Sequence, residues 1–203
     1  VSFVMLYQDR LYAMLNAFAL HAFVLALSVA WQAFIQDAPH LYVTASIALV
    51  FKAFVIPMAL HRIIRRLGIH RQIETVVGIG PTMLAGMGLV ALSMVLMLRV
   101  TEGADPLARE DLAFALSVVL LGLLTMVTRR NAVSQVVGFM ALENGLFFAA
   151  VVSTYGMPMV VELGIAFDVL VAAVLFGVFF LHLRDTIDSL DVDRLSRLTE
   201  DVE

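Results

Sequence analysis

The sequence has no cysteine, which excludes disulfide bonds, thiolate metal sites and cysteine nucleophiles. Charge is also scarce: charged residues are 15% of the 203 residues, whereas 62% are hydrophobic. The mean hydropathy of +0.96 lies far outside the range of soluble globular domains. The net charge of −4 is small, and no basic cluster of the kind needed for nucleic acid is present. The composition therefore indicates an integral membrane protein and excludes nucleic-acid binding.

Hydrophobic windows of about 20 residues, enough to cross a ~30 Å hydrocarbon core, predict the membrane spans. They fall at 11–35, 41–62, 77–98, 112–128, 133–154 and 160–183. Because the bilayer forbids unpaired backbone and no stretch alternates like a strand, each span is predicted to be an α-helix. The expected fold class is all-α: a polytopic transmembrane helix bundle, with one domain over 1–183 and a polar tail over 184–203.

The first residues, VSFVMLY, look like the end of a helix. They have neither the charged region nor the small-residue cleavage site of a signal peptide. We therefore expect one more transmembrane helix to begin upstream of Val1. The intact protein would then have seven helices, of which six are complete here.

The cations predict an orientation. Only Arg99 and Arg109 fall on one side of the predicted bundle. Ten fall on the other side: Arg10, Arg62, Arg65, Arg66, Arg71, Arg129, Arg130, Arg184, Arg194 and Arg197. By the positive-inside rule the side with ten is cytoplasmic, which places the C-terminal tail in the cytoplasm.

The only lysine of the chain, Lys52, lies at the midpoint of span 41–62. A lysine this deep cannot easily reach the membrane surface, so we expect it to face a carboxylate or water inside the protein. Pro57 frees the carbonyl of Ala53 one turn away, and His61 follows as a candidate supporting group. The alternative is a structural ion pair beside a tolerated kink.

A carboxylate, Glu143, lies at the middle of span 133–154, where an ionisable group costs on the order of 3 kcal/mol. Such groups normally face other helices or water and mark proton or ion pathways. Phe139 and Phe147 flank it, and Asn144 is a candidate hydrogen-bond partner or interhelical contact. Another face should let a neighbouring backbone approach, because it carries Gly138, Ala141, Gly145 and Ala149.

Three more ionisable residues fall in span 160–183. Glu162 lies near one end, Asp168 is deeper, and His182 lies at the inner edge. Glu162 and Asp168 are separated by about 9 Å along a helix axis and by about 120° around it, so they are not an acid–base pair. Asp168 is the better candidate for proton transfer, and His182 is a candidate switch or an interfacial residue.

No metal-ligand cluster at a recognised spacing, serine nucleophile with a base, or cofactor motif is found in the sequence. We therefore expect a non-catalytic chain with no cofactor of its own. Lys52, Glu143 and Asp168 lie at comparable depths on three spans. If those helices are neighbours, their charges form a row along the membrane plane, which would suit a proton relay.

Several segments resemble the hydrogenase-4 component E family of membrane-bound group 4 [NiFe] hydrogenase complexes such as formate hydrogenlyase. They are LVFKAFVIPMAL, TRRNAVSQVVGFMALENGLFFAA, VELGIAFDVLVAAVLF and the tail segment SLDVDRLSRL. Residues 129–183 also resemble the K-type subunit of respiratory complex I and the C subunit of Mrp antiporters. Against the K-type subunit the glutamate is displaced by one turn, since Met140 occupies its place. Asp168 aligns only after a shift of a few residues.

The resemblance implies a membrane-arm subunit in a bacterial or archaeal cytoplasmic membrane, in contact with lipid and beside antiporter-like subunits. The Ni-Fe centre and iron–sulfur clusters would belong to partner subunits of the peripheral arm. The family's intramembrane charges fall on Lys52, Glu143, Glu162 and Asp168, as a proton or ion path. The alternatives are a scaffold with static ion pairs, or a stand-alone carrier of a small solute, which the lack of an inverted repeat weakens.

Overall fold

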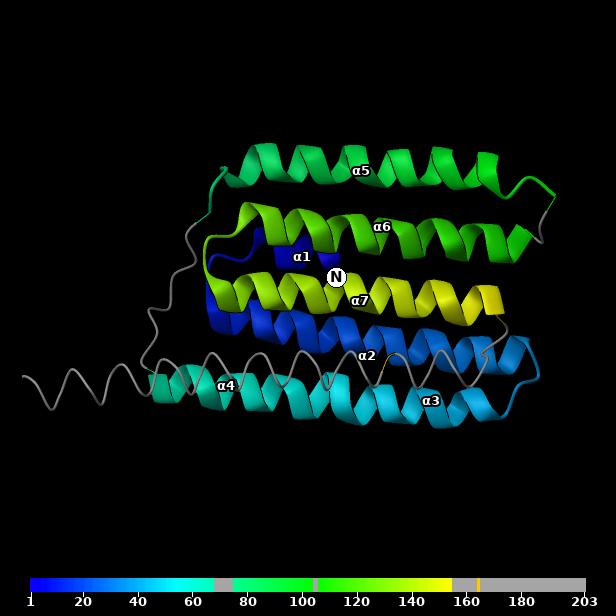
Figure 1. Cartoon of the computed structure of the whole chain (residues 1–203), viewed down its shortest axis with the longest axis horizontal. Helices are drawn as coiled ribbons and strands as arrows, with labels where there is room; N and C mark the ends of the chain where they lie inside the picture. Colours follow the sequence, from blue (N-terminus) through cyan, green and yellow to red (C-terminus); the bar gives the residue numbers. More distant parts are fainter. Residues whose placement is uncertain (68–74, 104–105, 155–163, 165–203) are drawn as a thin grey trace, which may run out of the picture.

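The chain forms a bundle of long helices that run side by side (Figure 1). The structure is a computed structural model that describes residues 1–67, 75–103, 106–154 and 164. Within these ranges it contains no named strand. In chain order the helices are α1 (Ser2–Tyr7), α2 (Leu11–Ile35), α3 (His40–Ala48), the π-helix η1 (Leu49–Val55), α4 (Ile56–Leu67), α5 (Ile79–Val100), α6 (Pro106–Thr128) and α7 (Ala132–Thr154).

The helical fold class and the first five predicted spans are confirmed. Five stretches are long and apolar enough to cross a membrane: Leu11–Ile35, His40–Arg62, Ile79–Val100, Pro106–Thr128 and Val133–Thr154. Large apolar side chains such as Trp31, Phe34 and Val127 are exposed on the bundle surface, as expected where lipid is the solvent. The sixth predicted span, 160–183, lies outside the described residues except for Gly164.

The predicted start of the fourth span, residue 112, is wrong, because α6 begins at Pro106. Proline suits the first position of a helix, where its missing N–H would have no partner in any case. The charged residues that follow it, Arg109, Glu110 and Asp111, therefore lie on the helix and not in a loop. As a result α6 brings a carboxylate to the end of the bundle where α2 also ends (Figure 1).

The second span is not the uninterrupted α-helix that was expected. Its middle, Leu49–Val55, is a π-helix, and the Ile56 N–H donates to the carbonyl of Phe51, five residues earlier. Pro57 follows immediately and has no N–H to continue the α-helical ladder. Lys52 lies in this π-helix, and its side chain points into the protein and is buried.

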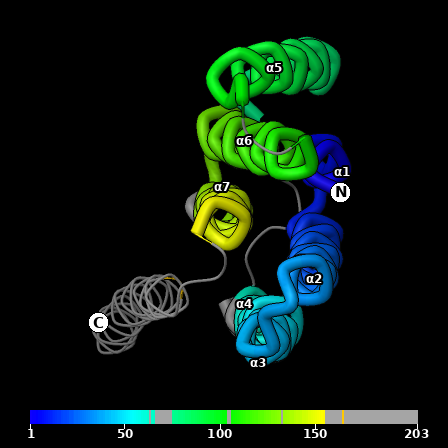
Figure 2. The backbone as a smooth tube through the Cα atoms, turned by 90° about the vertical axis from the view of Figure 1, so that its right-hand side faces the viewer, coloured from blue at the N-terminus to red at the C-terminus, as the bar shows by residue number. Residues whose placement is uncertain are grey.

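The central position in the bundle belongs to α7, which packs against α6 on one side and α2 on the other (Figure 2). Beyond α6 lies α5, while α3, η1 and α4 pack against α2. The short α1 contacts α2, α5 and α6. Because α7 carries Glu143, this order places the carboxylate at the middle of the molecule.

Glycines allow α6 and α7 to approach closely. A Cβ added to Gly138 would lie 2.9 Å from the Met126 backbone nitrogen, and one added to Gly145 would lie 2.8 Å from that of Val119. From the α6 side, a Cβ at Gly122 would lie 2.5 Å from the backbone nitrogen of Leu142. The predicted close approach at Gly138 and Gly145 is therefore confirmed, and α6 is the neighbour.

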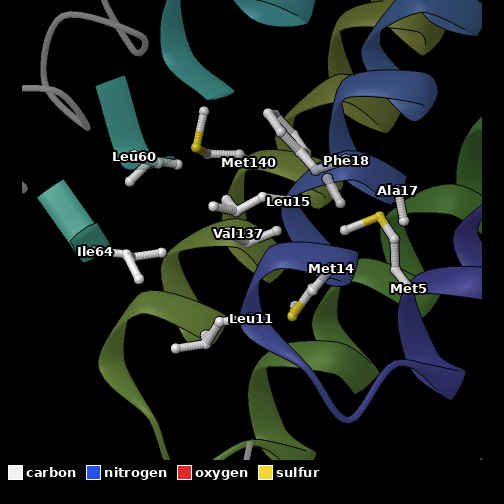
Figure 3. Close-up of a cluster of buried hydrophobic side chains, with 11 residues drawn as sticks. Met5, Leu11, Met14, Leu15, Ala17, Phe18, Leu60, Ile64, Val137 and Met140 are labelled. Carbon is white, nitrogen blue, oxygen red and sulfur yellow. The ribbon is translucent and has the colours of Figure 1, made fainter. Parts of the chain in front are cut away.

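Two apolar clusters fill the bundle at different heights. The first joins α1, α2, α4 and α7 (Figure 3) through Met5, Leu11, Met14, Leu15, Ala17, Phe18, Leu60, Ile64, Val137, Met140 and Ala141. The second joins α2, α7 and the α3 region through Leu25, Val29, Ala33, Ala38, Leu41, Ala45, Phe147 and Val151. Along α7 the first cluster stops at Ala141 and the second starts at Phe147, so Glu143 lies between them.

At one end of the bundle, Arg129 connects the α6–α7 turn to α1. Its side chain is buried and Nη2 donates to the carbonyls of Met5 (3.3 Å) and Leu6 (2.6 Å). Burial lowers the pKa of Arg129, but an arginine stays protonated in proteins. The guanidinium therefore satisfies carbonyls near the end of the six-residue α1.

Replacing Arg129 with methionine should release α1, because charged hydrogen bonds to these carbonyls contribute about 1.5–3 kcal/mol. Hydrogen exchange at residues 2–7 in the membrane-embedded protein is expected to become faster. The adjacent Arg130 is exposed, so Arg130→Met is the matched control and should leave that exchange unchanged. Equal acceleration by both variants would contradict the role of Arg129.

Candidate functional site

A buried ion pair joins η1 to α7. Lys52 Nζ donates to both carboxylate oxygens of Glu143, at 2.7 Å to Oε1 and 2.6 Å to Oε2. The two side chains are only 4% and 8% exposed. The Lys52 ammonium also lies 5.2 Å from the centroid of the Phe147 ring, within the range of a cation–π contact. The expectation that Lys52 faces a carboxylate is therefore confirmed.

A chain of polar side chains continues from the ion pair to α2 and α1. Lys52 Nζ lies 3.3 Å from Asn144 Oδ1, and Asn144 Nδ2 lies 3.2 Å from His21 Nδ1. The other ring nitrogen, His21 Nε2, lies 3.1 Å from Ser2 Oγ. His21 and Asn144 are both buried. Five polar side chains from four helical segments thus form one connected network.

The network lies near the mid-depth of the bundle. Glu143 is the middle residue of the 23 in α7, and Lys52 lies one residue from the middle of the 23-residue span His40–Arg62. On α2, His21 falls between Phe18 of the first apolar cluster and Leu25 of the second. The buried members, His21, Lys52, Glu143 and Asn144, therefore form a polar layer bounded by apolar side chains on both sides.

A cavity of about 210 Å³ adjoins this layer between α1, α2, α6 and α7. His21 and Asn144 line it, together with Ser2, Ser28 and Val118. Lys52 and Glu143 are not among its lining residues, so they lie behind Asn144 as seen from the cavity. The cavity wall thus contains a titratable ring and an amide that contacts the buried lysine.

A second polar group lies towards the end of α2. Gln32 is buried and its amide nitrogen donates to Asp111 Oδ2 at 2.5 Å, while Gln36 donates to Gln32 Oε1 at 2.9 Å. His21, Ser28 and Gln32 are spaced so that they share one face of α2. Among the described residues, no cluster of three or more His, Asp or Glu side chains could hold a metal ion.

The structure brings together three of the predicted site residues: Lys52, Glu143 and Asn144. His61 is separate, because its Nδ1–H donates to the Pro57 carbonyl (2.8 Å) on its own helix and its ring stacks on Tyr12. Glu162, Asp168 and His182 lie outside the described residues. Their neighbour in sequence, Gly164, is close to the pair, since a Cβ there would lie 4.0 Å from Glu143 Oε1.

Sequence reasoning missed His21 and Ser2. The available signal was an ionisable residue inside a membrane span, because His21 lies within 11–35 just as Lys52 lies within 41–62. Ser2 gave no signal, since a serine near a helix end commonly bonds its own backbone. Its contact with His21 depends on how α1 folds back beside α2.

The fold and the site define a class: a multi-pass helical membrane protein with an ion pair buried between its central helices. A Mycobacterium tuberculosis protein, uncharacterized protein Rv0085, is 32% identical over 168 residues, which are 82% of this chain and 76% of that protein. Hydrogenase-4 component E of Escherichia coli K12 is 30% identical over 165 residues, 79% of this chain and 74% of the relative. The same figures hold for hydrogenase-4 component E of Shigella flexneri.

The chain belongs to the hydrogenase-4 component E family, as its sequence segments predicted. No family model matches it, and no solved structure does. The resemblance of residues 129–183 to the complex I and Mrp subunits stays a prediction.

Proposed function

We propose that this chain is a membrane subunit of a multisubunit hydrogenase complex and that its Lys52–Glu143 pair carries protons between redox chemistry in other subunits and the membrane. The relative from Escherichia coli is named as a component of hydrogenase-4. The chain supplies no cofactor in this proposal; a Ni-Fe centre and iron–sulfur clusters belong to partner subunits. Antiporter-like membrane subunits and the peripheral arm are the proposed neighbours.

The observation that carries the proposal is the ion pair itself. Lys52 and Glu143 meet at 2.6 Å at mid-depth and are linked through Asn144 to a third titratable side chain, His21. Buried ionisable groups inside membrane helices are costly and mark proton relays and ion pathways. Asp168, with Glu162 and His182, is proposed to continue the path, and Pro57 supports it by interrupting the helix beside Lys52.

The orientation is proposed from the distribution of arginines. In the described part of the chain, the α1–α2 turn, the end of α4 and the α6–α7 turn lie at one end of the bundle (Figure 1). These segments carry Arg10, Arg62, Arg65, Arg129 and Arg130. We assign that end, and the C-terminal tail, to the cytoplasmic side of a bacterial or archaeal inner membrane.

The test is Glu143→Gln in the assembled complex reconstituted into vesicles. Glutamine keeps the shape and a hydrogen-bond acceptor for Lys52 but cannot bind and release a proton. Proton movement coupled to the hydrogenase reaction is expected to fall on the order of a hundredfold or more. The measurement is a pH-sensitive dye inside the vesicles, with subunit composition checked in the same preparation.

A scaffold role predicts a different pattern. If the pair only fixes helix register, the apolar double variant Lys52→Met/Glu143→Leu should retain both assembly and proton movement, because apolar side chains of similar volume often replace a buried ion pair without loss of stability. If the pair carries protons, the double variant should assemble but remain unable to move them. Normal proton movement in an assembled Glu143→Gln complex would contradict the proposed function.

A further inference from the structure

The orientation of the Asn144 amide is fixed by its neighbours. A lysine ammonium has three donors and no acceptor, so the atom that faces Lys52 at 3.3 Å must be the amide oxygen. The amide nitrogen then faces His21 Nδ1 at 3.2 Å and donates to it. Asn144 therefore accepts from one titratable group and donates to the other.

This orientation also fixes the protonation state of His21. Because Nδ1 accepts from Asn144, it carries no proton, and the imidazole proton is on Nε2. Nε2 donates to Ser2 Oγ at 3.1 Å. These contacts assign a neutral imidazole to His21 and an ammonium, paired with the Glu143 carboxylate, to Lys52.

Protonation of His21 requires the amide to turn over. A doubly protonated imidazole donates from both nitrogens, so Nδ1–H would meet the Asn144 NH2 group. Rotating the amide presents its oxygen to His21 and its NH2 group to Lys52. That NH2 group can be accommodated only by a neutral amine, whose lone pair accepts the hydrogen bond. The two protonation states are therefore linked through one amide.

We infer that Asn144 couples proton uptake by His21, from the cavity between α1, α2, α6 and α7, to proton release by Lys52. The inference rests on the proposed function. Ser2 on α1 and Asn144 on α7 contact His21 directly, and Lys52 and Glu143 lie behind Asn144. His21 and Asn144 both line the cavity, so the proposal places the proton exchange of the ring at this cavity.

In this step one proton enters the layer at His21 and another moves within the layer, from Lys52 to Glu143. His21 Nδ1 takes a proton from cavity water, Lys52 Nζ transfers one proton to the Glu143 carboxylate, and the Asn144 amide turns over. The layer then holds an imidazolium, a neutral amine and a carboxylic acid, one positive charge more than before. Loss of the Glu143 proton to the next group in the path and return of the His21 proton to Lys52 restore the starting state.

The experiment uses the reconstituted complex with His21→Ala and His21→Gln. Both variants remove the titratable ring, so coupled proton movement is expected to fall on the order of a hundredfold while the subunits remain assembled. Imidazole added to the His21→Ala complex should restore it, because the cavity of about 210 Å³ adjoins the space that the ring vacates. His21→Gln retains the side-chain volume and should not respond to imidazole.

His61→Ala is the matched control, because that histidine bonds its own helix and does not line the cavity. Proton movement in the His61→Ala complex should be unchanged, and added imidazole should not alter it. Asn144→Leu leaves both titratable groups in place but should abolish coupled movement. If His21→Ala prevents assembly, Val118→Phe, which fills the cavity from α6, tests the same route and should slow proton movement.

The outcomes separate the two proposals. Full proton movement in an assembled His21→Gln or Asn144→Leu complex, with movement lost in Glu143→Gln, overturns the coupling but leaves the proposed function intact. Full movement in Glu143→Gln overturns the proposed function. Loss of proton movement in His21→Gln, Asn144→Leu and Glu143→Gln, with recovery of movement in His21→Ala by imidazole, supports the coupling.

Discussion

Replacing Lys52 with methionine is expected to destabilise the folded chain by about 3–5 kcal/mol, because it removes the ammonium that pairs with the buried Glu143 carboxylate. The Glu143 side chain is 8% exposed, and both of its carboxylate oxygens accept a short hydrogen bond from the Lys52 ammonium. Methionine matches the lysine stem in length, so the loss of stability reports the removal of the charge, including its contact with the Phe147 ring. The measurement is the fraction folded during titration with a denaturing detergent.

The apolar double variant Lys52→Met/Glu143→Leu is the control for this result. Removing both charges should recover most of the stability, because replacing a buried pair with apolar side chains of similar volume is often neutral or stabilising. A double variant as unstable as Lys52→Met alone would show that the loss came from packing around residue 52. The stabilisation attributed to the Lys52–Glu143 ion pair would then be contradicted.

Substituting Gly122 with leucine is expected to separate α6 from α7. A Cβ at this position would lie 2.5 Å from the backbone nitrogen and 2.7 Å from Cα of Leu142, so a helix backbone would have to move. Overpacking against movable side chains costs about 1–3 kcal/mol, and a rigid backbone leaves less scope for relief. We expect a loss of at least that size, measured by the same detergent titration and by the yield of assembled complex.

Gly88 on α5 provides the matched control, because a Cβ there meets nothing within 4 Å. Gly88→Leu changes the same residue type in the same class of helix and should leave the folded fraction unchanged. Equal losses in both variants would show that leucine at any helical glycine is harmful here. The close contact between α6 and α7 would then not explain the effect.

Much of the architecture could be predicted from the sequence, because membrane spans follow from apolar length alone. The span 11–35 coincides with α2, and the cost of an unpaired charge in hydrocarbon predicted that Lys52 faces a carboxylate or water, of which the structure shows the carboxylate. The small-residue face at Gly138 and Gly145 was predictable for the same kind of reason, since glycine permits backbone contact. These predictions needed only the local composition and general rules, namely the free-energy cost of an unpaired charge in hydrocarbon and the close approach that glycine permits.

The rest depends on how distant segments meet. The π-helix over Leu49–Val55 has no local sequence signal beyond Pro57, and its Lys52 meets Glu143, 91 positions away in the sequence. The contact between His21 and Asn144 joins residues 123 positions apart. The start of α6 at Pro106 was missed because its charged first turns resemble a loop in composition. The two contacts between distant segments cannot be predicted from any short stretch of sequence, whereas the start of α6 at Pro106 is a local signal that was overlooked.

Under the proposed function, the polar layer between the two apolar clusters also determines where electrical work is done. Because apolar side chains pack on both sides of this layer, we expect most of the transmembrane voltage to fall across the packed regions. In the proposed relay, a proton that passes sideways among His21, Lys52 and Glu143 moves along a plane of nearly constant potential. Moving one elementary charge across 100 mV requires ~2.3 kcal/mol of work. That work is therefore done at the steps that take the proton into or out of the plane.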